Sequence, residues 1–280
     1  MNKFIRMSCC ALLVVASLAV QAAADRSKEE ARLLVAAQVL DELRAQRDQA
    51  IPQHLLQRAY AVAVIPSVTK VALVLGGRRG NGVMVVRDSR GRFSSPVFIN
   101  LTGASVGLQW GAQETDIVLV FTSRRGVEGI AGGKLTLGVG ASAAAGPVGR
   151  HAEVAAGVAA EVYAYSRARG LFAGIALDGT SLTIAGKSND AWYGRRGVLA
   201  SEIMNGAATA PDSENSRRFY AALAASTGET ADTSPAPAAS AAPATATMPV
   251  ESGAQPAPAS SGQVQTFPME DPSPGKEPPR

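Results

Sequence analysis

The sequence is poor in the residues that most often carry chemistry. It has two cysteines, Cys9 and Cys10, and two histidines, His54 and His151. Both cysteines lie within the first ten residues. If this N-terminal segment is removed, the remaining chain has no thiol. It can then have no cysteine nucleophile, no disulfide and no cysteine metal site. The two histidines stand far apart without a zinc-type spacing. The sequence therefore predicts no metal and no cofactor.

The first residues have the pattern of an export signal. Lys3 and Arg6 precede the apolar run CCALLVVASLAVQAAA, and Ala22 and Ala24 follow the small-x-small rule for cleavage before Asp25. The run is short for an uncleaved anchor, since a membrane span needs about 20 apolar residues. We expect residues 1–24 to be a signal peptide and the protein to be exported, to the periplasm or the cell envelope.

Aromatic residues make up only 5% of the chain. Proteins that bind single-stranded nucleic acid stack bases on exposed aromatic side chains between basic residues. The scarcity of aromatic residues and the export signal together argue against a nucleic-acid partner.

Composition divides the rest of the chain into two parts. Eleven of the 16 prolines lie after residue 226, in a segment rich in alanine and serine where large apolar side chains are almost absent. Such a segment cannot bury enough surface to fold, so we expect residues 227–280 to be a disordered tail. Residues 25–226 are long enough for one domain with its own core.

The middle of this domain is basic. Residues 51–200 hold 16 lysines and arginines against 8 acidic residues. In an exported protein this charge favours an anionic membrane surface as partner. The alternative is that the charge only keeps the domain soluble.

Hydrophobic spacing predicts an α+β fold. Helical periodicity begins after Ser27 and Glu30, which form a capping-box pattern, and predicts an amphipathic helix over 27–48. A period of two and short apolar runs follow, separated by turn residues. We expect strands at 61–66, 70–75, 82–88, 96–101, 104–111, 116–122, 134–146, 152–167, 170–177 and 181–186, and further helices at 54–60, 189–204 and 212–225, the last capped by Asp212. The predicted architecture is an all-antiparallel sheet curled as a barrel or sandwich, with helices at both ends of the chain.

Arginines are the main candidates for a binding site. Several come in close pairs, among them the two in the glycine-rich stretch GGRRGNG (76–82), where a loop could present them to phosphate. The plainer interpretation of that stretch is an exposed hairpin turn. In YSRARGLFAG (165–174) a strand would place both arginines on one face. The predicted anion-binding residues are Arg78, Arg79, Arg124, Arg125, Arg150, Arg167 and Arg169.

One motif has the letters of a hydrolase. GASVG (103–107) matches the nucleophile pattern G-x-S-x-G around Ser105, and Asp116 and His151 follow in the order of a catalytic triad. The nucleophile of that pattern stands on a sharp turn from strand to helix, whereas both flanks here are strand-like. We therefore expect no catalytic site at Ser105 and no enzyme.

The stretch AAGPVGRHAEVAAGVAAEVYAYSRARGLFAGIALDGTSL (144–182) resembles the signature of the SYLF lipid-binding domain family. The segments upstream, AVAVIPSVTKVALVLGGRRGNGVMVVRD and FSSPVFINLTGASVGLQWGAQETDIVLVF, follow the order of that family. The resemblance covers residues 37 to 203.

The resemblance implies a compact, mainly β domain with helices and no known catalysis. Eukaryotic members of the family bind phosphoinositide-rich membranes, and some bind actin and carry an SH3 domain. For an exported chain we expect binding of anionic phospholipid or the membrane surface and no contact with actin. Glu161 or Asp178 could instead pair with Arg167 and Arg169, and the alternative function is an envelope protein-interaction module that uses the proline-rich tail as spacer or ligand.

Overall fold

The computed structural model describes residues 2–45, 51–72, 75–88, 90–106, 111–147, 160–168 and 171–228. The predicted tail from residue 229 onward lies outside the described residues, as do Arg150, His151 and Arg169. The structure has six helices and nine strands in these residues, and it confirms the predicted α+β class. The helices are α1 (Asn2–Ala45), α2 (Gln53–Gln57), α3 (Arg124–Ala131), α4 (Gly186–Tyr193), α5 (Ala200–Met204) and α6 (Glu214–Thr227).

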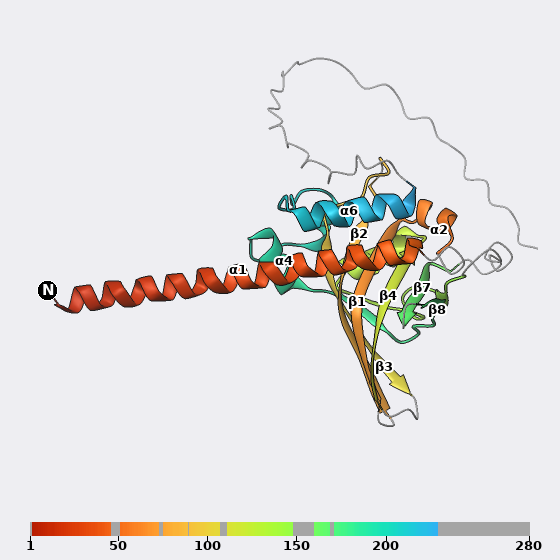
Figure 1. Cartoon of the computed structure of the whole chain (residues 1–280), viewed down its shortest axis with the longest axis horizontal. Coiled ribbons are helices and arrows are strands. Elements are labelled where there is room, and N and C mark those ends of the chain that lie inside the picture. The colour runs from red at the N-terminus through yellow and green to blue at the C-terminus, as the bar shows by residue number, and fades with distance from the viewer. Residues whose placement is uncertain are drawn as a thin grey trace, which may run out of the picture. The chain divides into compact units, whose positions relative to one another are not determined.

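The strands form one curled sheet in the order β5-β9-β3-β2-β1-β4-β7-β6, with β8 paired to β7 (Figure 1). Four strands, β1 to β4, are long. They lie side by side in the order β3-β2-β1-β4, each antiparallel to its neighbours, and the other five strands are short. Their bounds are β1 (Ala61–Ala72), β2 (Leu75–Val86), β3 (Val97–Val106), β4 (Gly111–Phe121), β5 (Lys134–Thr136), β6 (Ala143–Ala145), β7 (Val162–Ala168), β8 (Leu171–Gly174) and β9 (Ser181–Ile184). The expectation of an entirely antiparallel sheet is wrong at one place, because β6 pairs with β7 in parallel.

Two apolar clusters lie on the two faces of this sheet. On the face that we call the helix face, Val62, Val64, Val83 and Val85 pack with α1, α2, α4 and α6. On the opposite face, the alternate residues of the same strands pack with α3, α5, β5 and β9. Successive residues of these strands point to opposite faces. Apolar residues on both faces are buried here, because helices or short strands cover each face.

The first helix starts earlier than its sequence pattern predicts. Ser27 does not cap a helix. It lies in the interior of α1, where its hydroxyl donates to the carbonyl of Ala23 (2.9 Å). Buried residues of α1 recur from Leu33 to Leu43 and pack against the sheet and α6. No helix among the described residues is both long enough and apolar enough to cross a membrane.

The predicted strand at 61–66 and the first half of the one at 70–75 are one strand, β1, which contains a bulge between Ile65 and Val68, whereas Leu75 begins β2. Pro66 lies in this bulge, where the absence of an N–H costs no ladder hydrogen bond. Ser67 adopts a positive φ of 49°, and its N–H donates to Asp116 Oδ1 (2.9 Å). The bulge bends β1 between its two halves.

The stretch 76–82 is neither a loop nor a hairpin turn. It lies inside β2, where it pairs with β3 over its whole length and with β1 over residues 76–79. Two glycines make this possible, because a side chain on Gly80 or Gly82 would clash with Ile65 on the neighbouring strand. The sequence pattern could not show this, since glycine-rich stretches usually mark turns.

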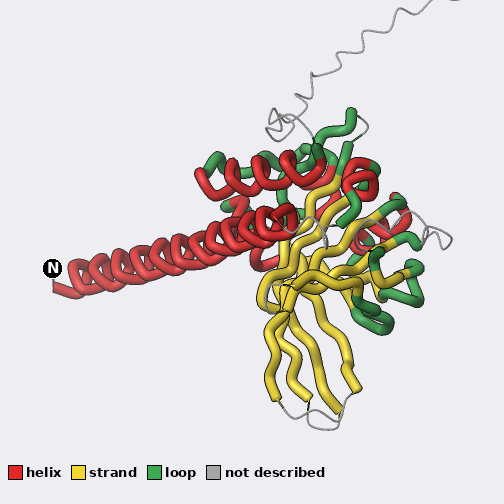
Figure 2. The backbone as a smooth tube through the Cα atoms, turned by 45° about the vertical axis from the view of Figure 1, so that its right-hand side comes forward, coloured by secondary structure: helices red, strands yellow, loops and turns green. Residues whose placement is uncertain are grey.

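Four strand ends meet at what we call the distal end of the sheet. There β1 ends at Ala72, β2 begins at Leu75, β3 ends at Val106 and β4 begins at Gly111. Figure 2 shows the distal halves of these strands extending past the helices that cover the rest of the sheet. The short strands stop before this region, since β9 pairs with β3 only as far as Thr102 and β7 pairs with β4 only as far as Asp116.

Two helix predictions at the C-terminal side need correction. The helix expected over 189–204 is two helices, α4 and α5, because Gly194 and Gly197 between them adopt left-handed φ angles of 64° and 72°. The N-cap of α6 is Ser213, whose hydroxyl accepts from the N–H of Ser216 (3.2 Å), and not Asp212.

A buried amide attaches α4 to the sheet. The pairing of β9 with β3 stops at Ile184 opposite Ile99, and beyond it the Asn189 side chain continues the ladder. Asn189 accepts from the N–H of Phe98 (2.8 Å) and donates to the Phe98 carbonyl (3.2 Å). Asn189 is fully buried.

We expect Asn189→Ala to lower the free energy of unfolding by about 2 kcal/mol, because it leaves the buried N–H of Phe98 without an acceptor. Denaturant unfolding measures this. The neighbouring Ser188→Ala is the matched control and should change stability by less than about 0.5 kcal/mol. Equal effects of the two substitutions would show that the amide does not act as a strand partner.

Candidate functional site

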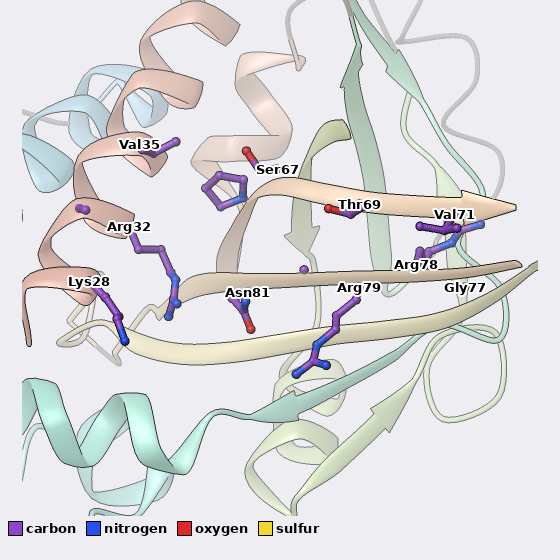
Figure 3. Close-up of a pocket in the computed structure, with 13 residues that line it drawn as sticks. Lys28, Arg32, Val35, Ser67, Thr69, Val71, Gly77, Arg78, Arg79 and Asn81 are labelled. Carbon is purple, nitrogen blue, oxygen red and sulfur yellow. The ribbon is translucent and has the colours of Figure 1, made fainter. Parts of the chain in front are cut away.

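The strongest candidate site is an open groove of about 740 Å³ between α1 and the distal half of the sheet (Figure 3). One wall is a single face of α1, and the floor is formed by β1 from its bulge onward and by β2. Four basic residues and no acidic residue line it. We call it the basic groove, and its lining is Lys28, Ala31, Arg32, Val35, Pro66, Ser67, Thr69, Val71, Gly77, Arg78, Arg79, Gly80 and Asn81.

The basic residues of α1 are held by neighbours on the same helix. Arg32 forms an ion pair with the buried Glu29, and its guanidinium lies 5.6 Å from the centre of the Phe98 ring. Lys28 forms an exposed ion pair with Asp25 at 3.2 Å. Exposed pairs of this kind contribute little to stability, so the Lys28 ammonium can readily exchange its partner for a ligand.

The basic residues of β2 are arranged differently. Successive side chains of a strand alternate between its faces, so Arg79 shares the helix face with Asn81, and Arg78 points to the opposite face. Cross-strand partners lie on the same face, which places Thr69 of β1 and Thr102 of β3 beside Arg79. Arg79 is exposed and has no ion-pair or hydrogen-bond partner among the described residues.

Arg78 is more buried than Arg79. The stem of Arg78 packs over Gly103 of β3, and a Cβ at that glycine would lie 3.2 Å from Arg78 Cγ and 2.8 Å from Thr180 Oγ1. Burial lowers the pKa of the Arg78 guanidinium from its ordinary value. Its Nε and the hydroxyl of Thr180 are buried without a partner in the described part of the chain.

The predicted binding residue Arg167 has a different environment. It lies on β7 directly opposite Asp116 of β4, and its guanidinium contacts the Asp116 carboxylate at 2.6 Å. It also forms an ion pair with Glu42 of α1. Arg167 thus joins α1 to the sheet and is neutralised by acids other than the expected Glu161 or Asp178.

Arg124 and Arg125, two further predicted arginines, do not line this groove. Arg124 and Arg125 begin α3, a helix that the sequence did not predict, and α3 follows the end of β4 that is far from the distal end. The ten residues from Glu114 of β4, which is level with Arg79, to Arg124 correspond to about 30 Å of extended chain. Arg124 pairs with Glu128 at 2.7 Å. Arg150 and Arg169 lie outside the described residues, so their assignment stays a prediction.

Sequence reasoning missed Lys28 and Arg32 as site residues. The near-neutral charge of the helix concealed them, because Asp25 and Glu29 balance them in the count. Their spacing of four residues was a usable signal, since it places two cations on one helical face.

The G-x-S-x-G motif has no nucleophile geometry. Ser105 lies within β3, one residue before its end, and not at a turn from strand to helix. Asp116, the required acid, is bonded to Ser67 and Arg167. No group of three or more potential metal ligands occurs in the described part of the chain.

Comparison with known proteins shows what this domain is similar to. Residues 102–226 match the family model described as "Ysc84: Las17-binding protein actin regulator". This match and the relatives below confirm the resemblance predicted from residues 144–182.

Three curated relatives illustrate the similarity. The SH3 domain-containing YSC84-like protein 1 of Xenopus laevis is 38% identical over 162 residues, which are 57% of this chain and 48% of the relative. Protein YSC84 of Saccharomyces cerevisiae is 39% identical over 152 residues, 52% of this chain and 32% of the relative. The human YSC84-like protein 1 is 37% identical over 149 residues, 52% of this chain and 43% of the relative. The match spans half or less of each relative, and no solved structure matches the chain.

Proposed function

We propose, from the premise that residues 102–226 carry a Ysc84-family (SYLF) domain, that this protein is a non-enzymatic, exported module that binds anionic phospholipid at a membrane surface. The phosphate-bearing headgroup occupies the basic groove. The observation that carries this proposal is Arg79, an exposed guanidinium without a partner among the described residues, in a groove lined by no carboxylate.

The size and chemistry of the groove support a phosphate ligand. Its volume of about 740 Å³ lies within the range of small-molecule sites. A guanidinium donates two parallel hydrogen bonds to a phosphate. Thr69 and Asn81 add neutral donors on the same face, and Lys28 adds a cation from α1.

The proposed export is compatible with this site. Cleavage near Ala24 would leave Lys28 and Arg32 in the mature chain, close to its new N-terminus. The α-amino group released at Asp25 would add a positive charge one helical turn before Lys28. The anionic surface of a membrane in the envelope is then the available partner.

Vesicle co-sedimentation tests the proposal. We expect the protein to bind phosphatidylcholine vesicles that contain phosphatidylglycerol, to bind less as salt rises, and to leave pure phosphatidylcholine vesicles unbound. Arg79→Gln should weaken binding about fivefold, because one basic residue near an anionic surface contributes about 1 kcal/mol. Arg196→Gln is the matched control, since Arg196 is exposed in the turn before α5 and does not line the groove. Equal sedimentation with both vesicle types would contradict the proposal.

A second candidate function is protein binding, and the names of the relatives favour it. The family model is described as a Las17-binding actin regulator, and one relative of Saccharomyces cerevisiae is named LAS seventeen-binding protein 3. In this chain the proline-rich segment 229–280 would be the spacer or ligand. Deleting it should abolish capture of an envelope partner and leave vesicle binding unchanged if both functions exist.

A further inference from the structure

The distal half of the sheet carries, on both of its faces, cations that have no ion-pair partner among the described residues. On the helix face, Thr69, Arg79 and Thr102 form one row across β1, β2 and β3. The adjacent row, one residue along each strand, lies on the opposite face and consists of Lys70, Arg78 and Gly103. We infer, on the basis of the proposed function, that the sheet docks end-on, with its distal end entering the headgroup layer of an anionic bilayer so that both rows contact phosphates.

The opposite-face row is arranged for an anion. Lys70 and Arg78 are direct cross-strand partners, and like charges in that position repel each other. Neither has an ion-pair partner among the described residues. Arg78 is held in place by its packing over Gly103 and beside Thr180, whose buried hydroxyl is also unpartnered there. A phosphate between these cations would remove the repulsion.

Acidic side chains are scarce in this region. In the described distal segments 67–72, 75–81, 101–106 and 111–115, Glu114 is the one acidic residue, against three basic residues. Glu114 lies on the helix face, opposite Thr69 and two strands away from Arg79. The opposite-face row therefore has a purely positive side-chain charge in these strands.

An apolar side chain lies ahead of the cations. Val71 is 50% exposed on the helix face and is closer to the distal end than Arg79. Its cross-strand neighbour on β2 is Gly77, which has no side chain to cover it. If the distal end enters a bilayer surface, Val71 reaches the boundary of the acyl chains while the cations behind it stay at the level of the phosphates.

The position of α1 favours the end-on orientation over contact with a single face. The helix forms one wall of the basic groove, so a flat bilayer that approached Arg79 along the helix face would meet α1 first (Figure 3). Contact with one face would also leave the cations of the other face in water. Entry from the distal end brings both rows to the phosphates, because the helices do not extend to that end (Figure 2).

Charge reversal on each face tests the inference with the full protein. Lys70→Glu changes the opposite face, Arg79→Glu changes the helix face, and Arg196→Glu is the control with the same change in net charge. We expect the first two to weaken binding to phosphatidylcholine–phosphatidylglycerol vesicles at least about tenfold each, and the control to change it less than twofold. Circular dichroism confirms that each variant is folded.

The outcomes separate this inference from the proposed function. If only one of the two reversals weakens binding, the bilayer contacts one face, and the end-on inference is overturned while lipid binding stands. If the unaltered protein does not bind anionic vesicles, the proposed function fails, and a protein partner becomes the explanation of the cations. If the protein binds but neither reversal matters, both proposals are wrong about the site.

Discussion

Arg167→Met should lower the free energy of unfolding by about 3 kcal/mol and leave anionic-vesicle binding of the folded protein within about twofold of its original value. Arg167 is paired with Asp116 and Glu42, and the Asp116 side chain is only 12% exposed. Burial raises the pKa of the Asp116 carboxyl and lowers the pKa of the Arg167 guanidinium, so both groups are desolvated. Removing the arginine leaves a buried carboxylate without its countercharge, and this is more costly than losing an exposed pair.

Arg79→Met is the reciprocal control for this experiment. Arg79 is exposed and has no partner among the described residues, so its substitution should change stability by less than about 0.5 kcal/mol and should weaken vesicle binding. Denaturant unfolding and co-sedimentation on the same two variants give a two-by-two comparison. If folded Arg167→Met loses vesicle binding while its stability is unchanged, Arg167 belongs to the binding site, as the sequence predicted.

Trp192→Ala is expected to lower the free energy of unfolding by about 4 kcal/mol, the largest effect that we predict. The side chain is fully buried between the helix face of the sheet and the helices. Its ring meets Phe98 edge-on with centroids 5.8 Å apart, and the guanidinium of Arg26 lies 5.8 Å from its centre. Truncation removes these contacts and leaves a cavity where α4 meets the sheet.

Trp192→Phe is the matched variant. The indole N–H of Trp192 is buried without a partner among the described residues, so phenylalanine keeps most of the packing and removes an unsatisfied donor. We expect a loss of about 1 kcal/mol or less. Thermal or denaturant unfolding measures both variants, and a similar loss in the two would mean that the indole donor has a partner that stabilises the fold.

Local patterns in the sequence were sufficient for the class of fold and for most of its elements. Alternating apolar residues predicted the strands at 82–88, 96–101 and 116–122, and their spacing in α6 predicted a helix close to its observed bounds. These elements follow from neighbouring residues, because a strand or helix with one buried face shows its own period. Residues 144–182 also carried the resemblance to the family that the comparison confirms.

Other elements depended on contacts between distant segments. GGRRGNG is a strand because its glycines let β1 approach, and glycine spacing alone does not distinguish this from a turn. Helix α3 is eight residues long, and its glycines at 126 and 129 weakened the helical pattern. The packing of Gly126 against Phe121 and of Gly129 against Leu135 explains why glycine is placed there.

The sequence by itself determined an α+β domain with many basic residues, a leader-like N-terminus, a proline-rich end and a recognisable family signature. Only the tertiary structure decided which cations have partners. Arg167 meets acids 51 and 125 positions away in the chain, whereas Arg78 and Arg79 meet none among the described residues, although all of them look alike in sequence. The physical reason is that an ion pair acts over a few ångströms of space, and strand register and helix docking set those distances, not the order of residues.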